Sequence, residues 1–77
     1  METSERVKLM LEGIEREKQE YRRDMGKYPD KVFLHPYSIE KIEEVTKHFE
    51  TRYEIGKLND MKIVLDESRE PYEYAVE

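Results

Sequence analysis

The sequence predicts a small α+β domain in which two helices pack on one face of a sheet of three or four strands. Two observations lead to this prediction. Apolar residues recur at three- and four-residue steps in residues 3–25 and 37–51, as they do in amphipathic helices. Short apolar or alternating runs follow each of these segments, as is typical of strands. The expected order is helix, strand, helix, strand, strand, with helices and sheet in separate layers.

Length and composition limit what this chain can be. Its 77 residues make one domain, with a long charged helix over residues 1–26 and a β-α-β-β unit over residues 27–77. Charged residues make up 43% of the chain, against roughly 25% in an average globular protein, and hydrophobic residues only 36%. So short a chain buries a small core, and we expect a second copy or a partner to cover part of its apolar surface.

The first helix is expected to begin at Thr3 or Ser4 and to end before Gly26, a residue suited to the left-handed position after a helix. At 1.5 Å per residue it is roughly 33 Å long, as long as a domain of this size is wide. It either docks by its two ends or projects and pairs with a second copy. Its apolar stripe is the candidate oligomer face, which comprises Val7, Met10, Ile14 and Tyr21.

A short strand from Lys31 to His35 is expected next, with apolar residues on both of its faces. Pro36 ends this strand, and the second helix begins at Ser38, or at His35 with Pro36 in the first helical position. That helix is predicted from about Tyr37 to Thr51. Its apolar face consists of Ile39, Ile42, Val45, Thr46 and Phe49, with Tyr53 continuing it.

The remaining residues predict a hairpin region. Residues 53–55 are either a short strand or a continuation of the preceding segment, and residues 57–60 read as a turn. Residues 61–66 are the clearest strand, and residues 72–76 alternate as a half-exposed strand does. The connection through the second helix is long enough to make the first strand and strand 61–66 parallel neighbours.

The charge balance and the absence of cysteine indicate a compartment and a class of partner. No disulfide or thiolate metal site is possible, so we expect a cytoplasmic protein, and no apolar run is long enough to enter a membrane. The net charge is −5, and residues 53–77 hold seven acidic and three basic residues. This is not the basic footprint of a nucleic-acid binder. The acidic loop of residues 66–70, together with Glu73 and Glu77, is either a solvated loop and an edge strand protected by charge, or a mimic of nucleic-acid phosphates that blocks a basic partner protein.

No pattern in the sequence predicts catalysis, a metal or a cofactor. His35 and His48 stand 13 residues apart, and neither has a histidine or cysteine at ligand spacing. No glycine-rich loop is present to hold a phosphate, and no serine lies in a nucleophile elbow. We therefore expect a protein that is not an enzyme.

Tyrosine provides the strongest indication of a binding surface. The chain has six tyrosines, and this side chain combines a large apolar area with a polar tip, which suits interfaces. Some of these rings are expected to cover the thin core. The others, with a histidine at the same strand, form the candidate interaction surface, which comprises Tyr28, His35, Tyr37 and Tyr72.

Residues 28–76 combine the run Tyr-Pro-Asp-Lys-Val-Phe-Leu-His-Pro-Tyr-Ser, a helix, Met-Lys-Ile-Val-Leu-Asp, a loop and Tyr-Glu-Tyr-Ala-Val. This segment resembles a part of tailed-bacteriophage major capsid proteins and short uncharacterised proteins of phages and prophages. The resemblance leaves the first helix unaccounted for and implies a phage or mobile-element origin. Together these features predict a non-enzymatic protein-binding module that also self-associates, or alternatively an acidic inhibitor or nucleic-acid mimic.

Overall fold

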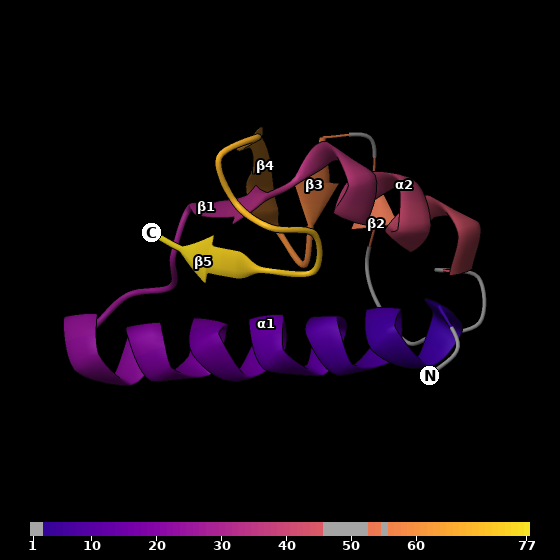
Figure 1. Cartoon of the computed structure of the whole chain (residues 1–77). Coiled ribbons are helices and arrows are strands. Elements are labelled where there is room, and N and C mark those ends of the chain that lie inside the picture. Colours follow the sequence, from indigo (N-terminus) through magenta and orange to yellow (C-terminus); the bar gives the residue numbers. More distant parts are fainter. Residues whose placement is uncertain (1–2, 46–52, 55) are drawn as a thin grey trace.

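A mixed sheet and two helices make up the α+β fold in the computed structural model, which describes residues 3–45, 53–54 and 56–77 (Figure 1). The predicted fold class is confirmed. In chain order, the elements are α1 (Thr3–Met25), β1 (Lys31–Leu34), α2 (Pro36–Val45), β2 (Tyr53–Glu54), β3 (Lys57–Leu58), β4 (Met61–Leu65) and β5 (Tyr74–Val76).

The sheet has the strand order β2-β3-β4-β1-β5. Strands β1 and β4 are parallel, as the long connection between them predicted, and the other pairs are antiparallel. The sheet has five strands instead of three or four because β2 and β3, each of two residues, extend one side. Residues 57–60 are therefore not a simple turn. Asn59 and Asp60, with φ of 48° and 68°, form the tight turn alone, and both have the positive φ that a two-residue hairpin needs.

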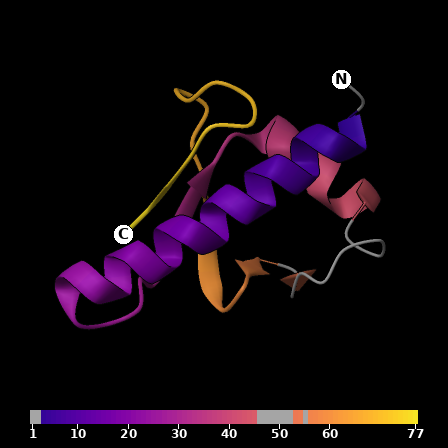
Figure 2. The same cartoon turned by 90° about the horizontal axis from the view of Figure 1, so that it is seen from below.

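Helix α1 spans the molecule. Its 23 residues have a length of about 34 Å, and the longest dimension of the fold is 35 Å. Seen from below, α1 crosses in front of the other elements (Figure 2). The helix ends where the sequence predicted, because Gly26 takes a left-handed φ of 78° and its N–H donates to the Arg22 carbonyl.

Helix α2 begins at Pro36 because His35 caps it. The Nδ1 atom of His35 accepts a hydrogen bond from the Tyr37 N–H at 3.0 Å, and its carbonyl accepts from the Ser38 N–H at 2.9 Å. This settles the start of the helix in favour of His35 over Ser38. The predicted continuation to Thr51, with Thr46 and Phe49 on its apolar face, lies outside the described residues, as does the side chain of Tyr53.

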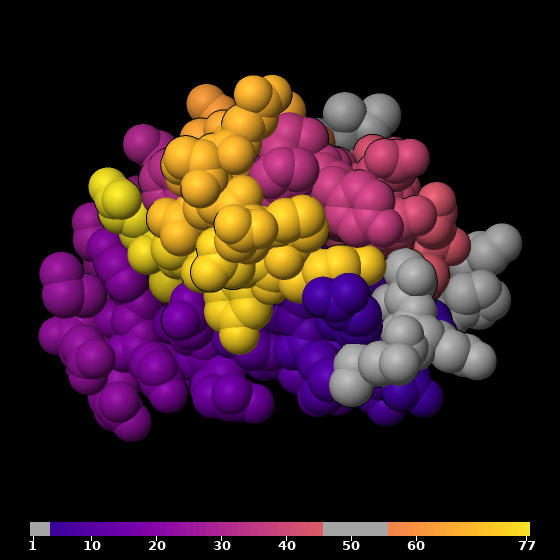
Figure 3. Space-filling view, viewed as in Figure 1, coloured from indigo at the N-terminus to yellow at the C-terminus, as the bar shows by residue number. Residues whose placement is uncertain are grey.

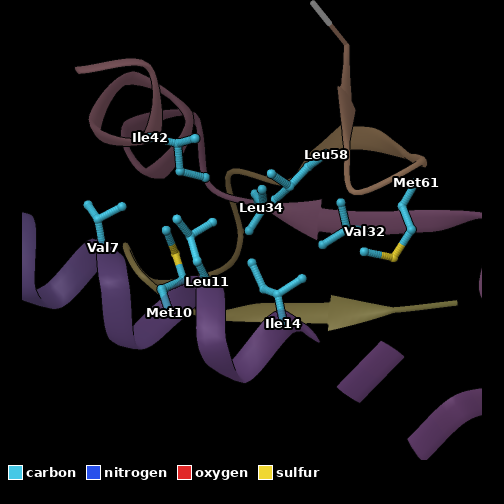
Figure 4. Close-up of a cluster of buried hydrophobic side chains, with 9 residues drawn as sticks. All are labelled: Val7, Met10, Leu11, Ile14, Val32, Leu34, Ile42, Leu58 and Met61. Atoms are coloured by element: carbon cyan, nitrogen blue, oxygen red, sulfur yellow. The ribbon is translucent and has the colours of Figure 1, made fainter. Parts of the chain in front are cut away.

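One apolar cluster lies between α1, α2 and the sheet (Figure 4). Helix α1 supplies one side of it and the strands the other, while Ile42 enters from α2. The buried members are Val7, Met10, Leu11, Ile14, Val32, Leu34, Ile42, Leu58 and Met61. Because these strand residues alternate with exposed ones, the helices cover a single face of the sheet, as predicted.

The candidate oligomer face on α1 is wrong for three of its four residues. Val7, Met10 and Ile14 are each at most 3% exposed and pack inside the molecule itself. Tyr21 is half-buried. The helix packs on β5 and α2 of the same chain. Val7, Met10 and Ile14 are therefore covered within the molecule and are not available to a second copy.

The C-terminal segment lies directly on α1 (Figure 3). Gly13 permits this close approach, because a Cβ at that position would lie 1.8 Å from the Tyr74 hydroxyl oxygen. No helix in the part of the chain that the structure describes is both long and apolar enough to cross a lipid bilayer.

Candidate functional site

The structure divides the four predicted surface residues between the two ends of β1. Tyr37 and Tyr72 pack together beside His35 at the carboxyl end of the strand. Tyr28 lies before the other end and packs against α1 instead. Cations of α1 lie over both Tyr72 and Tyr28, and their positions show that the two rings are far apart. Arg6 lies over Tyr72, whereas Lys18 lies over Tyr28 and comes 12 residues later, about 18 Å further along the helix. Tyr28 therefore lies apart from the group of Tyr37, Tyr72 and His35.

The rings of Tyr37 and Tyr72 meet edge to face, with their centroids 6.0 Å apart and their planes at 79°. This is a favourable arrangement for two aromatic rings. Tyr72 has a φ of 69°, which is uncommon for a residue with a side chain. Its N–H donates a hydrogen bond of 2.8 Å to the hydroxyl of Ser38, which is fully buried. The first turn of α2 thus holds the backbone of Tyr72 in place.

Cations lie against both rings. The guanidinium carbon of Arg6 is 4.1 Å from the Tyr72 ring centroid, and the Lys41 ammonium is 5.1 Å from that of Tyr37. Contacts of this kind attract through the negative face of the ring. Burial lowers the pKa of Lys41, but the Glu44 carboxylate 3.5 Å away and the Tyr37 hydroxyl outweigh it and raise the pKa overall.

A shallow groove of about 260 Å³ adjoins the rings. Its lining comes from the first turns of α1 and from the C-terminal segment, and consists of Arg6, Leu9, Met10, Tyr72 and Tyr74. Leu9 is 55% exposed and Tyr37 is 41% exposed, so both present apolar surface to solvent. We refer to Arg6, Leu9, His35, Tyr37 and Tyr72 as the aromatic patch.

Tyr28 forms a separate contact at the other end of α1. Lys18 and Arg22 lie 5.2 and 5.0 Å from its ring centroid, one helical turn apart. The ring is 48% exposed, and the Lys18 ammonium also donates to the Asn59 carbonyl at 3.0 Å. These contacts attach the turn before β1 to the helix, which is a structural role for Tyr28.

Part of the acidic loop is used within the fold. The carboxylate of Asp66 accepts hydrogen bonds from the hydroxyl and the N–H of Ser68 and lies 3.1 Å from Arg69 Nε. The Ser68 hydroxyl bond is the main reason why the pKa of Asp66 is lowered. Glu73 accepts from the Glu70 N–H at 2.8 Å. Two of the loop's carboxylates therefore shape the loop itself.

Within residues 3–45, 53–54 and 56–77, no three histidine or acidic side chains gather in a way that would hold a metal ion. His48 lies outside the described residues. The pKa of Glu17 is raised, first by burial and then by the neighbouring Glu20, while Arg69 opposes the shift. Glu17 lies at the surface of α1, apart from the aromatic patch.

Sequence reasoning missed Arg6, Leu9 and Lys41. Lys41 follows Tyr37 by four residues in a predicted helix, and this spacing places two side chains on the same helical face, so the contact was detectable. Arg6 and Leu9 meet Tyr72 only through tertiary packing, because more than 60 positions of sequence separate them.

Comparisons with protein-family models, with curated proteins and with solved structures gave no match for this chain.

Proposed function

We propose that this protein is a non-enzymatic module that binds another protein through the aromatic patch. The observation that carries the proposal is the pair of Tyr37 and Tyr72 rings beside an exposed Leu9 and a shallow groove. Tyrosine and arginine are enriched at the energetic centres of protein interfaces, and such centres pack against small apolar pockets. The hydrogen bond from the Tyr72 N–H to buried Ser38 supports the proposal further, because a backbone that is already fixed at Tyr72 loses little entropy on binding.

The shape of the groove favours a protein partner over a small molecule. Pockets for small molecules usually measure about 300–1,000 Å³ and enclose most of the ligand. At about 260 Å³, the groove has room for one or two side chains of a partner and leaves them open to solvent. Among the described residues, the pKa is shifted at Glu17, Lys41 and Asp66, none of which lines the groove. The small volume of the groove therefore supports a role in binding a partner protein.

The proposal extends to the setting in which the protein acts. The resemblance of residues 28–76 to phage proteins supports a phage or mobile-element origin, and the absence of cysteine supports a cytoplasmic location. The partner is a different protein or a second copy of this chain. The alternative of an acidic nucleic-acid mimic has less support, because Asp66 and Glu73 are held by the loop's own hydrogen bonds.

Affinity purification from the native host tests the proposal with two matched double variants as bait. The patch variant carries Leu9→Ser and Tyr37→Ala, and the control carries Met25→Ser and Tyr28→Ala. The exposed fractions are comparable, 55% and 41% for the patch pair and 62% and 48% for the control pair. Partner recovery should fall at least tenfold with the patch variant, about 1.4 kcal/mol of binding free energy, and stay near the wild-type level with the control.

Two results would overturn the proposal. One is a partner that the patch variant retains as well as the wild type does. The other is an equal loss with both variants, which would mean that any removal of exposed apolar surface weakens the complex. Light scattering after size-exclusion chromatography distinguishes a second copy from a different protein, since self-association raises the measured mass of the purified chain alone.

A further inference from the structure

Three lysines lie side by side across the middle of the sheet. Lys57 on β3 stands opposite Lys62 on β4, and Lys62 stands opposite Lys31 on β1. Each lysine is exposed, and its neighbour in the same strand is a buried core residue. These neighbours are Val32 in β1, Leu58 in β3 and Met61 in β4. Because side chains alternate along a strand, all three lysines project from the face opposite the helices. We refer to Lys31, Lys57 and Lys62 as the lysine row.

The lysine row is an electrostatically unfavourable arrangement. Neighbouring strands are about 4.8 Å apart, so three positive charges fall within about 10 Å along the row. Like charges directly opposite one another destabilise a sheet. None of the ion pairs among the described side chains includes Lys31, Lys57 or Lys62. A protein with a net charge of −5 thus holds three neighbouring cations, and no carboxylate of the described side chains forms an ion pair with them.

An apolar strip runs beside the lysine row on the same face. Phe33 is in register with Val64 on one side and with Ala75 on the other, and all three side chains are half-buried. The guanidinium carbon of Arg69 lies 5.8 Å from the Phe33 ring centroid. The face therefore offers cations and apolar side chains in two adjacent parallel lines.

The ends of the row restrict the length of an anionic ligand. At one end of the row, Glu77 exchanges two backbone hydrogen bonds of 3.0 Å with Lys31 and so lies directly across from it. At the other end, Glu54 of β2 is in register with Lys57. A long polyanion would run onto these acidic positions, whereas a stretch of two or three carboxylates would not. Proteins that bind single-stranded nucleic acid usually also offer exposed aromatic rings on which the bases stack. Phe33, the one ring that the described strands place on this face, is half-buried beside Arg69.

We infer that this face is a second binding surface, which takes a short acidic segment of a partner protein. In an extended segment, alternate residues are about 6.8 Å apart and point the same way, so two or three carboxylates can meet the lysine row. The lysine side chains are flexible enough to make up the difference between this spacing of about 6.8 Å and the spacing of about 4.8 Å between neighbouring strands. Apolar side chains next to those carboxylates then contact the strip of Phe33, Val64 and Ala75. Charge complementarity with the three lysines and the length limit set by Glu54 and Glu77 both favour this occupant.

The test measures the affinity of the full chain for a fluorescent ten-residue peptide of alternating glutamate and valine, at several salt concentrations. One variant replaces the lysine row with glutamine (Lys31→Gln, Lys57→Gln, Lys62→Gln). The control replaces three exposed cations of α1 (Lys8→Gln, Arg16→Gln, Arg23→Gln), so both variants carry the same net charge. We expect the row variant to bind at least tenfold more weakly than the wild type and the control to bind within twofold of it. Affinity should fall as salt rises.

A further variant keeps the test decisive if the triple replacement affects folding. Lys62→Glu reverses the central charge, relieves the repulsion in the row and should still abolish peptide binding. The inference is overturned if the control weakens binding as much as the row variant does, or if the wild type does not bind the peptide. It is also overturned if a twelve-residue oligothymidylate binds more tightly than the peptide, because nucleic acid would then be the preferred occupant. The double variant of the aromatic patch should bind the peptide as the wild type does, because the two surfaces are separate. A failure of the peptide to bind the lysine row would therefore not contradict the proposed function.

Discussion

The close approach of Gly13 and Tyr74 makes a sharp prediction about what holds α1 on the sheet. Replacing Gly13 with alanine adds a Cβ that would lie 1.8 Å from the Tyr74 hydroxyl oxygen and 2.7 Å from its Cζ. Tyr74 belongs to β5 and is paired with Leu34 of β1, so its backbone is fixed. The ring must therefore leave its place between the strand and the helix.

The magnitude follows from two opposing effects. Overpacking a well-filled site costs about 1–3 kcal/mol. Alanine is favoured over glycine within a helix by about 1 kcal/mol. Gly13→Ala should therefore lower the free energy of unfolding by about 1 kcal/mol. In a Tyr74→Val background the ring is absent, and the same replacement should raise the free energy of unfolding by about 1 kcal/mol. The coupling between the two positions is then about 2 kcal/mol, within the range seen for residues in contact.

Urea denaturation followed by circular dichroism at 222 nm measures all four chains of this double-mutant cycle. Tyr74→Phe removes the hydroxyl but leaves Cζ too near, so it should relieve Gly13→Ala only in part. Glu12→Ala, at the exposed neighbouring position, serves as the control and should have the same small effect in both backgrounds. If Gly13→Ala stabilises the chain equally with and without the Tyr74 ring, the described contact between α1 and β5 is refuted.

Three further predictions concern single side chains. Ser38→Ala leaves the Tyr72 N–H without its acceptor and should cost about 1–3 kcal/mol of stability and speed hydrogen exchange at that amide; unchanged exchange would contradict the bond. Lys62→Glu turns two repulsive cross-strand pairs into attractive ones and should stabilise the fold by about 0.5–2 kcal/mol, less at high salt, whereas a loss would refute the register of the lysine row. The pKa of Asp66 is lowered from its ordinary 3.8, mainly by the hydrogen bond from the Ser68 hydroxyl. Its stabilising effect is therefore present above that value and disappears as the pH falls through the lowered pKa. Asp66→Asn should be less stable than the wild type at neutral pH, the difference should disappear as the pH falls below 3.8 and through the lowered pKa, and a difference that persists in acid would refute this.

The candidate site was only partly accessible from the sequence. His35 and Tyr37 were found because His35 lies at the end of a strand and Tyr37 at the start of a helix, and local sequence patterns indicate both positions. Their grouping with Tyr72 is produced by the loop after β4, whose path depends on the Asp66 and Ser68 hydrogen bonds and on the Ser38 hydroxyl. The lysine row was missed because Lys57 was assigned to a turn, and its alignment with the other strands exists only in the folded sheet.

By itself, the sequence determined the two helices, the limits of α1 and the parallel pairing of β1 with β4. These features follow from periodicity, from turn and cap residues such as Gly26 and from the length of a connection, which are properties of neighbouring residues. The tertiary structure alone decided which apolar residues are covered. The α1 stripe read equally well as an oligomer face and as a core face until Val7, Met10 and Ile14 proved to be buried against the strands. A hydrophobic stripe requires a cover but carries no information about which surface supplies it, because hydrophobic burial has no direction.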